Sequence, residues 1–193
     1  MYAEPKESLH EFSHFAFSPL ESGGETWDLA HLTPFALRVD IGLPRHIDAV
    51  ILFSCHCFTH SIARDKRDEN DIPKEEVYDD GRERRVLNRE RYEFSKTLLI
   101  PLVQALPERH IVVANYAQRN FMTWEVQADN GEALCYGVFF DVEKDRSRQH
   151  RVIVRIQSAY ILENGLTQRQ RRAKKVRWPT LVKATYEGRK IRP

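Results

Sequence analysis

The chain has few cysteines and no long apolar run. Three cysteines, Cys55, Cys57 and Cys135, occur in 193 residues. A small, odd number argues against a disulfide framework and favours a reducing, cytoplasmic setting. No stretch approaches the roughly 20 apolar residues of a membrane-spanning helix. Residues 1–11 are acidic and contain no apolar region, so we expect neither a signal peptide nor a membrane partner.

The sequence also lacks a glycine-rich phosphate loop, a dinucleotide-binding fingerprint, internal repeats and low-complexity tracts. These absences argue against nucleotide-driven and hydride-transfer chemistry. We expect no cofactor. The hydrophobic content of 41% and charged content of 30% are typical of a globular protein that buries a core and has a charged surface.

Positive charge is concentrated near the C-terminus, although the net charge is only +2. Between residues 169 and 192 the sole acidic residue is Glu187, and the basic residues are Arg169, Arg171, Arg172, Lys174, Lys175, Arg177, Lys183, Arg189, Lys190 and Arg192. Such a segment is typical of a nucleic-acid contact, and it also occurs as a solvated tail. Apolar residues between the charges favour packing on the domain.

Residues 135–161 dominate the hydrophobic pattern. Apolar side chains alternate with others from Cys135 to Val142 and again from Val152 to Tyr160, on either side of a polar turn at residues 144–150. A period of two in both arms predicts a long antiparallel hairpin with one buried face. Strict alternation places Ser158 and Tyr160 opposite Arg155, and a β-bulge would change that relation.

Other segments complete an α+β pattern. Residues 88–106 have apolar side chains at helical spacing, with Asn88 as N-cap, and Pro101 predicts a kink near residues 97–100. We expect strands at residues 35–41, 48–60, 111–116 and 121–126, an extended segment at 12–20, and a short helix at 168–176. These elements predict a central antiparallel sheet with one main kinked helix on one face.

We expect one domain over residues 1–165 and a basic C-terminal extension over residues 166–193 that packs on or near it. Residues 63–85 are dense in charge, and we expect them to form a solvated loop or insertion or, if ordered, a lid over the site.

Polar residues on the open face of the predicted sheet suggest a catalytic site. If the strands are neighbours, Glu125, Asp141 and Arg155 lie on one surface together with Gln157. A carboxylate could take a proton from a ribose 2′-hydroxyl, Arg155 could stabilise the phosphate, and His110 or His150 could protonate the leaving oxygen. The alternative is an exposed sheet face with ordinary cross-strand ion pairs.

A helix followed by four antiparallel strands, the last of which carries Arg155, Ser158 and Tyr160, resembles the barnase–EndoU–colicin–RelE superfamily of small ribonucleases. The resemblance covers about residues 89–162. It implies that Arg155, Ser158 and Tyr160 lie at the active site, with His110 or His150 as the acid.

Cys55, His56, Cys57 and His60 form a compact cluster of potential metal ligands. Zinc sites usually have a longer spacing between cysteines and a second Cys/His pair, so two buried core cysteines are the favoured interpretation and we expect no metal site. His56, on the other face of the expected strand, could be functional or could hydrogen-bond a neighbour.

Aromatic and basic residues elsewhere could contact bases and phosphates. Tyr116 and Arg119 are candidates for stacking beside the second hairpin. The arginines around the start of the helix could bind phosphates or pair with Glu83 and Glu90; they are Arg82, Arg84, Arg85, Arg89 and Arg91.

Two functions from different classes remain. The first is a metal-independent endoribonuclease, encoded by a toxin–antitoxin pair or a mobile element, in which the basic segment holds RNA. The second is a non-enzymatic module that binds nucleic acid or protein through the same sheet and segment. An inhibitor or other partner protein and a homodimer formed through strand edges are further expectations.

Overall fold

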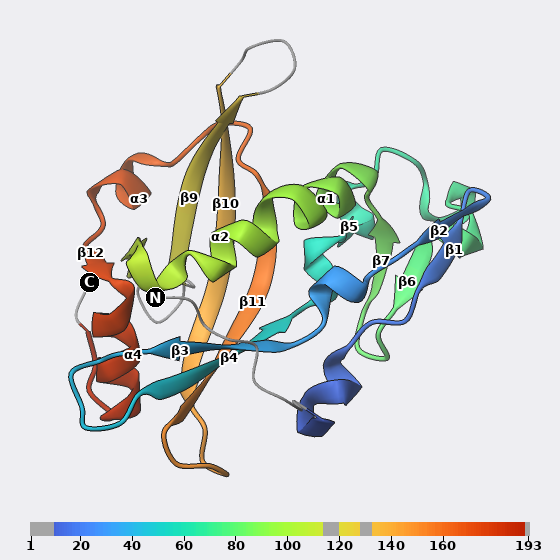
Figure 1. The fold of residues 1–193 in the computed structure, drawn as a ribbon. Helices are drawn as coiled ribbons and strands as arrows, with labels where there is room; N and C mark the ends of the chain where they lie inside the picture. The colour runs from blue at the N-terminus through green and yellow to red at the C-terminus, as the bar shows by residue number, and fades with distance from the viewer. Residues whose placement is uncertain (1–9, 114–119, 128–132, 192–193) are drawn as a thin grey trace.

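A computed structural model describes residues 10–113, 120–127 and 133–191. Within them, a curved sheet has seven strands in the order β12-β8-β9-β10-β11-β4-β3 (Figure 1). The strands are β3 (Phe35–Val39), β4 (Ile47–Phe53), β8 (His110–Val112), β9 (Asn120–Gln127), β10 (Ala133–Lys144), β11 (Arg151–Ile161) and β12 (Lys175–Arg177). Neighbours are antiparallel except β11 and β4, which are parallel. The predicted α+β class is confirmed.

The predicted long hairpin is strands β10 and β11, which pair antiparallel. Tyr136, Val138 and Phe140 on β10 are fully buried, as the alternation of the sequence requires for the face that packs on the core. This hairpin therefore forms the centre of the sheet, and the remaining strands are added on both sides of it.

A β-bulge interrupts strict alternation on β11. Phe139 pairs with Ser158, but the next residue, Phe140, pairs with Ile156, so Gln157 is the extra residue. Strand β4 ends beside it, where the Ser54 hydroxyl donates to the Gln157 carbonyl at 2.7 Å. The bulge reverses the side-chain direction beyond Gln157, so Ser158 faces the same side of the sheet as Arg155. The placement of Ser158 and Tyr160 opposite Arg155, which strict alternation predicted, is therefore wrong.

The main helix comprises α1 (Arg89–Phe94), a π-helical turn (Ser95–Leu99) and α2 (Ile100–Gln104), and it covers one face of the sheet (Figure 1). The predicted stripe is buried: Tyr92, Leu99, Leu102, Val103 and Leu106. Pro101 has no N–H for the carbonyl four residues earlier, and the wider turn precedes it. The predicted irregularity near residues 97–100 is confirmed.

Asn88 caps this helix as predicted, because its side-chain oxygen accepts from the Arg91 N–H at 2.8 Å. We expect Asn88→Ala to lower the free energy of unfolding by about 1 kcal/mol, which is the usual cost of a lost N-cap. Asn88→Ser is the control, since serine caps equally well. Urea denaturation of both variants measures the difference, and equal losses would contradict the capping role.

A second, three-stranded sheet stands beside the first, with the order β5-β7-β6. Its strands are β5 (Thr59–Ser61), β6 (Val77–Asp79) and β7 (Arg84–Leu87). The predicted single strand over residues 48–60 is therefore wrong, because β4 ends at Phe53 and a 3-10 turn, η3 (Cys55–Cys57), separates it from β5. The charged segment 63–85 contains β6 and the start of β7.

The other elements are short. The N-terminal segment predicted to be extended begins with a 3-10 helix, η1 (His10–Phe15), and is followed by a hairpin of β1 (Leu20–Ser22) and β2 (Glu25–Trp27). Further 3-10 turns are η2 (Ala30–Leu32), η4 (Ile62–Arg64), η5 (Glu69–Asp71), η6 (Lys74–Glu76) and η8 (Leu106–Glu108).

Two helices lie in the C-terminal segment: α3 (Gln168–Arg172) and α4 (Trp178–Tyr186). The predicted helix at 168–176 thus ends early, because β12 begins at Lys175, and α4 is additional. Helix α4 buries Trp178, Leu181, Val182 and Ala184 in the core. Within the described parts of the chain, no helix is long and apolar enough to span a membrane.

Candidate active site

The open sheet face separates the two predicted carboxylates. Glu125 pairs with Cys135 across β9 and β10, whereas Asp141 pairs with Arg155 across β10 and β11. Cys135 and Asp141 are six residues apart on one strand, a distance of about 20 Å at the usual rise per residue. Glu125 and Asp141 therefore cannot act on one phosphate.

Arg155 faces Asp141 but is already engaged. Its guanidinium forms an ion pair with Glu143 at 3.1 Å and lies 5.6 Å from the ring centroid of Phe15 on η1. The carboxylate and the aromatic ring occupy much of the surface that a phosphate would need. This part of the sheet has the geometry of a cross-strand ion-pair network.

The two predicted acids lie elsewhere. His110 is exposed on β8 and pairs with Arg177 of β12. His150 has a positive φ of 58° in the turn between β10 and β11, and its Nδ1 is 3.3 Å from the Tyr186 hydroxyl. Neither histidine lines a cleft with Arg155 among the clefts found in the described residues.

Ser158 and Tyr160 do share a concave site, which the β11 bulge creates. A pocket of about 240 Å³ lies beside the strand, and we call it the arginine pocket; its lining residues are His56, Ser61, Arg64, Arg85, Arg91, Ser158 and Tyr160. None of these described lining residues is acidic. The positive charge comes from three separate elements: η4, β7 and α1.

Each arginine is placed differently. Arg85 is 6% exposed and donates to Thr59 Oγ1 and to Glu83, both at 2.8 Å. Arg91 donates from one terminal nitrogen to the carbonyls of His56 and Thr59, and its guanidinium lies 4.7 Å from the Tyr160 ring centroid. These contacts fix both guanidiniums and leave further N–H groups available.

Arg64 completes the cluster from the exposed side of the pocket. Within the described residues, its guanidinium has no hydrogen-bond or ion-pair partner. Burial, together with the nearby charge of Arg85, lowers the pKa of Arg91. Like charges held together at a half-buried site are stabilised by an anion. The pocket can therefore accommodate a negatively charged group, and phosphate matches the fork geometry of guanidinium groups.

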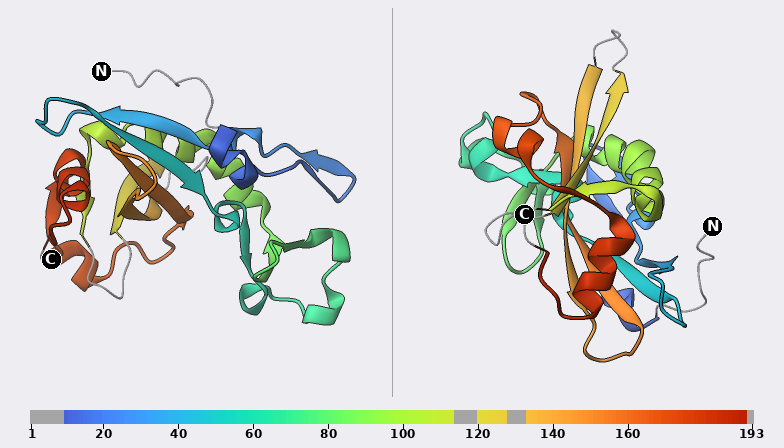
Figure 2. Two further views of the ribbon diagram at one scale, coloured as in Figure 1. Left: turned by 90° about the horizontal axis from the view of Figure 1, so that it is seen from below. Right: turned by 90° about the vertical axis from the view of Figure 1, so that its left-hand side faces the viewer.

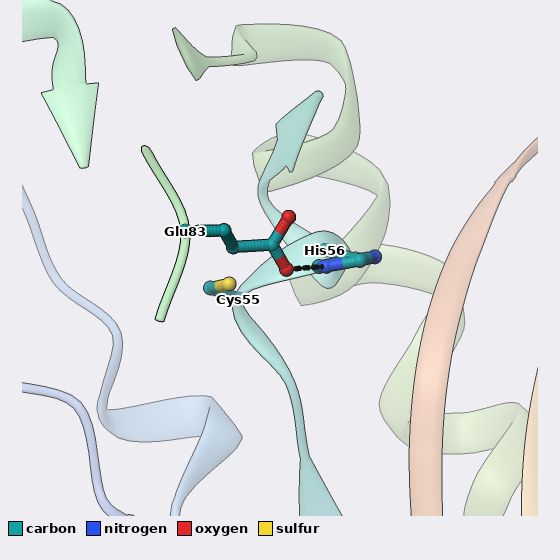
Figure 3. Close-up of side chains that lie close together, drawn as sticks. All are labelled: Cys55, His56 and Glu83. Carbon is teal, nitrogen blue, oxygen red and sulfur yellow. Dashed lines mark hydrogen bonds and ion pairs between the residues drawn. The ribbon is translucent and has the colours of Figure 1, made fainter. Parts of the chain in front are cut away.

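His56 adds an acid–base group to the arginine pocket. Its Nε2 is 2.5 Å from Glu83 Oε1 (Figure 3), and this contact is the main reason that the pKa of Glu83 is lowered. A carboxylate that accepts from Nε2–H leaves the other ring nitrogen, Nδ1, as a proton acceptor in the neutral ring. The sequence singled out His56, and it named Glu83 only as a possible ion-pair partner of the arginines around the start of the helix; nothing in the spacing joined Glu83 to His56, which lies 27 residues earlier.

A larger cleft of about 790 Å³ adjoins the arginine pocket and shares Arg64, Arg91 and Tyr160 with it. Its histidine, His60, is different from His56, because both ring nitrogens are occupied: Nε2 by Asp65 at 3.1 Å and Nδ1 by the Asn88 amide at 3.0 Å. His60 therefore connects η4 to the N-cap of the main helix and has no free ring nitrogen for a substrate.

The predicted nucleic-acid-binding segment begins just beyond this cleft. Gly165 is at the rim, and six exposed basic residues follow on α3, on β12 and in the short link between them: Arg169, Arg171, Arg172, Lys174, Lys175 and Arg177. Figure 2 shows that α3 lies on the side of the sheet opposite the main helix. Tyr116 and Arg119, the other predicted contacts, lie outside the described residues.

The cysteines of the cluster are buried as expected. Cys55 and Cys57 both pack in the main core, and burial raises the pKa of each thiol to about 12. Neither is therefore an activated nucleophile. Cys135 on β10 is half-buried, and burial raises its pKa as well.

Comparisons with known proteins place the chain in one family. No curated protein and no solved structure matches it. The model of the YjaZ family matches residues 14–186, a range that includes every residue of the arginine pocket and both histidine–carboxylate pairs. Because the match covers nearly the whole chain, this protein belongs to the YjaZ family.

Proposed function

We propose that this protein binds RNA with a phosphate in the arginine pocket and cleaves the adjacent phosphodiester bond without a metal ion. One observation supports the proposal above all others: Arg64, Arg85 and Arg91 converge on a pocket that also contains an imidazole oriented by a carboxylate. A set of fixed positive charges beside a general base is what phosphoryl transfer in RNA requires.

The reaction is an internal transesterification. Nδ1 of His56 accepts the proton of the ribose 2′-hydroxyl, whose oxygen forms a bond to phosphorus. The bond from phosphorus to the 5′-oxygen breaks, and that oxygen receives a proton from the Tyr160 hydroxyl. The products are a 2′,3′-cyclic phosphate and a free 5′-hydroxyl, and no water or oxidant is consumed. The arginines stabilise the extra negative charge on the phosphate oxygens in the transition state.

The surroundings suit a polymer better than a small phosphate ester. The arginine pocket opens into the larger cleft, which is lined by basic Lys66 and Arg67 and by acidic Asp65, Glu90 and Glu163. Arg67 is paired with Asp65 and Glu76, so Lys66 is the basic group of this cleft, beyond the shared arginines, that is available to a phosphate. The exposed charges of residues 169–177 continue from its rim. Positive groups along such a path contact successive phosphates and make affinity strongly dependent on salt.

The test is cleavage of labelled single-stranded RNA by purified protein in EDTA, with DNA of the same sequence as the control that lacks the 2′-hydroxyl. We expect RNA to be cut with a 2′,3′-cyclic phosphate end and DNA to remain intact. Arg64→Ala should lower the rate about 10²–10³-fold, as removal of one transition-state donor does. The same substitution should also lower the slope of log affinity against log salt concentration by about one, the change expected when one phosphate contact is lost.

Arg155→Ala is the matched control, because Arg155 lies on the sheet face outside the arginine pocket. It should cut RNA at the wild-type rate. If the protein binds RNA in a salt-sensitive way but does not cleave it, the proposed enzyme is wrong, and the protein is a non-enzymatic module that binds RNA at the same pocket. Loss of cleavage in Arg155→Ala with an unaffected Arg64→Ala would overturn the assignment of the site.

A further inference from the structure

A cluster of three potential metal ligands lies behind the arginine pocket. Among the described residues, Cys55, His56 and Glu83 bring one sulfur, one nitrogen and one oxygen atom within 4.8 Å of one another. Figure 3 shows the Glu83 carboxylate, from the residue just before β7, reaching towards His56, with the Cys55 sulfur close beside it. Two neighbouring residues of η3 and one distant residue thus meet at a single point.

The three atoms are ligands of the kind that zinc prefers. Thiolate, imidazole and carboxylate bind Zn²⁺ at about 2.3, 2.0–2.1 and 2.0–2.2 Å. His56 Nε2 and Glu83 Oε1 are now joined by a hydrogen bond of 2.5 Å. A tetrahedral ion between them would replace the shared proton and move the two side chains apart by about 1 Å. Side-chain rotation alone can supply that movement.

Neighbouring groups hold the ligands in place. Arg85 donates to the other oxygen of Glu83 at 2.8 Å, which directs Oε1 towards His56. Asp80 Oδ2 lies 3.7 Å from the Cys55 sulfur, and the Asp80 carboxylate is itself fixed by the backbone N–H groups of Arg82 and Glu83 at 2.9 and 3.0 Å. Arg85 thus fixes the Glu83 carboxylate and offsets its charge, and Asp80 positions the Cys55 thiol that the ion would deprotonate.

The site is accessible from solvent. A cleft of about 400 Å³ on the far side of η3 is lined by Cys55, Tyr78, Asp80 and Arg82, among other residues, whereas His56 lines the arginine pocket. The cluster therefore forms part of the wall between the two. Three protein ligands and an open side are the arrangement that leaves a coordination position for water or another ligand.

We propose that Cys55, His56 and Glu83 form a binding site for Zn²⁺, and that the ion regulates the arginine pocket by taking His56 away from substrate. The metal site stands on these three side chains alone. Its regulatory effect rests on the proposed RNA cleavage: when Nε2 of His56 binds the ion, the neutral ring carries its proton on Nδ1, which can then no longer accept the proton of the ribose 2′-hydroxyl.

Titration of metal-free, reduced protein with Co²⁺ tests the site without any nucleic acid. We expect a thiolate-to-cobalt charge-transfer band and tetrahedral d–d bands, and their displacement by Zn²⁺ with release of protons. Cys55→Ser should abolish the charge-transfer band, and Glu83→Gln should weaken binding at least 10-fold. Cys135→Ser, which changes a half-buried cysteine on β10, should bind as the wild type does.

Absence of the charge-transfer band in the wild type, or its persistence in Cys55→Ser, would overturn the metal site. The regulatory part is read separately, as the ratio of RNA cleavage rates with and without Zn²⁺. In the wild type, Zn²⁺ should slow RNA cleavage at least 10-fold, whereas in Cys55→Ser the two rates should be nearly equal. If the wild type cuts no RNA at all, the proposed cleavage fails while the cobalt spectrum still decides the metal site.

Discussion

Replacement of Trp178 by alanine is expected to lower the free energy of unfolding by about 3–5 kcal/mol, the usual cost of deleting a buried aromatic side chain. Trp178 is the first residue of α4 and has no exposed surface. Its ring packs edge-to-face against Phe140 of β10, with centroids 5.5 Å apart. The substitution therefore leaves a large cavity between α4 and the centre of the sheet.

Trp124→Ala is the matched control, because Trp124 is 37% exposed on β9 and contacts the Arg109 guanidinium at 4.2 Å. An exposed cation–π contact is worth about 0.5–1 kcal/mol. Urea denaturation followed by circular dichroism compares the two variants. Similar small losses in both would show that α4 is not an integral part of the core.

The burial of α4 also determines how the basic segment should be tested. A truncation after residue 166 would remove the exposed charges of α3 and β12 together with the four buried side chains of α4. Lost RNA binding in such a truncation would then reflect unfolding. Neutralising the exposed basic residues between 169 and 177, with α4 intact, separates electrostatic contact from stability.

Local periodicity predicted the elements that depend on neighbouring residues. The alternation of apolar side chains in residues 135–161 gave the central hairpin, and the helical stripe with Asn88 and Pro101 gave the capped, irregular main helix. In both cases one buried face requires one spacing of apolar residues. Those patterns were sufficient for the α+β class.

Long-range contacts account for what the sequence did not reveal. The parallel pairing of β4 with β11 joins segments about 100 residues apart, and no local pattern specifies it. At the bulge, the Ser54 hydroxyl at the end of β4 donates a hydrogen bond to the Gln157 carbonyl, and no local pattern near Gln157 indicates this distant contact. Without that bulge, Ser158 and Tyr160 would face the core side of the sheet, as strict alternation predicts.

The candidate site was hidden for the same reason. The sequence named Arg85 and Arg91 only among five arginines that could bind phosphates, and nothing in the spacing brought Arg64 to them, because Arg64 belongs to a charged segment typical of solvated loops. The ordering of that segment by β6, β7 and the His60–Asp65 pair places Arg64 at the pocket. Charged residues that are far apart in sequence form a site only when the fold brings them together.

The second large effect concerns His56. We expect His56→Gln to reduce the rate of RNA cleavage about 10²–10⁴-fold, the usual contribution of a general base, while RNA affinity remains within about two-fold, because the phosphate contacts come from arginines. The glutamine amide can still donate to Glu83, so the local structure should persist. Single-turnover cleavage in EDTA and binding at the same salt concentration measure the two quantities.

His60→Gln provides the sharpest comparison, since His60 lies in the adjoining cleft and also contacts a carboxylate. Its two ring nitrogens are already bonded to Asp65 and Asn88, so it has no nitrogen with which to take a proton from substrate. Its replacement should lower the stability of η4 and the helix N-terminus but change the cleavage rate less than 10-fold when the protein is folded. Equal losses in both variants would mean that neither imidazole transfers the proton, and that the histidines serve only to hold the arginines in position.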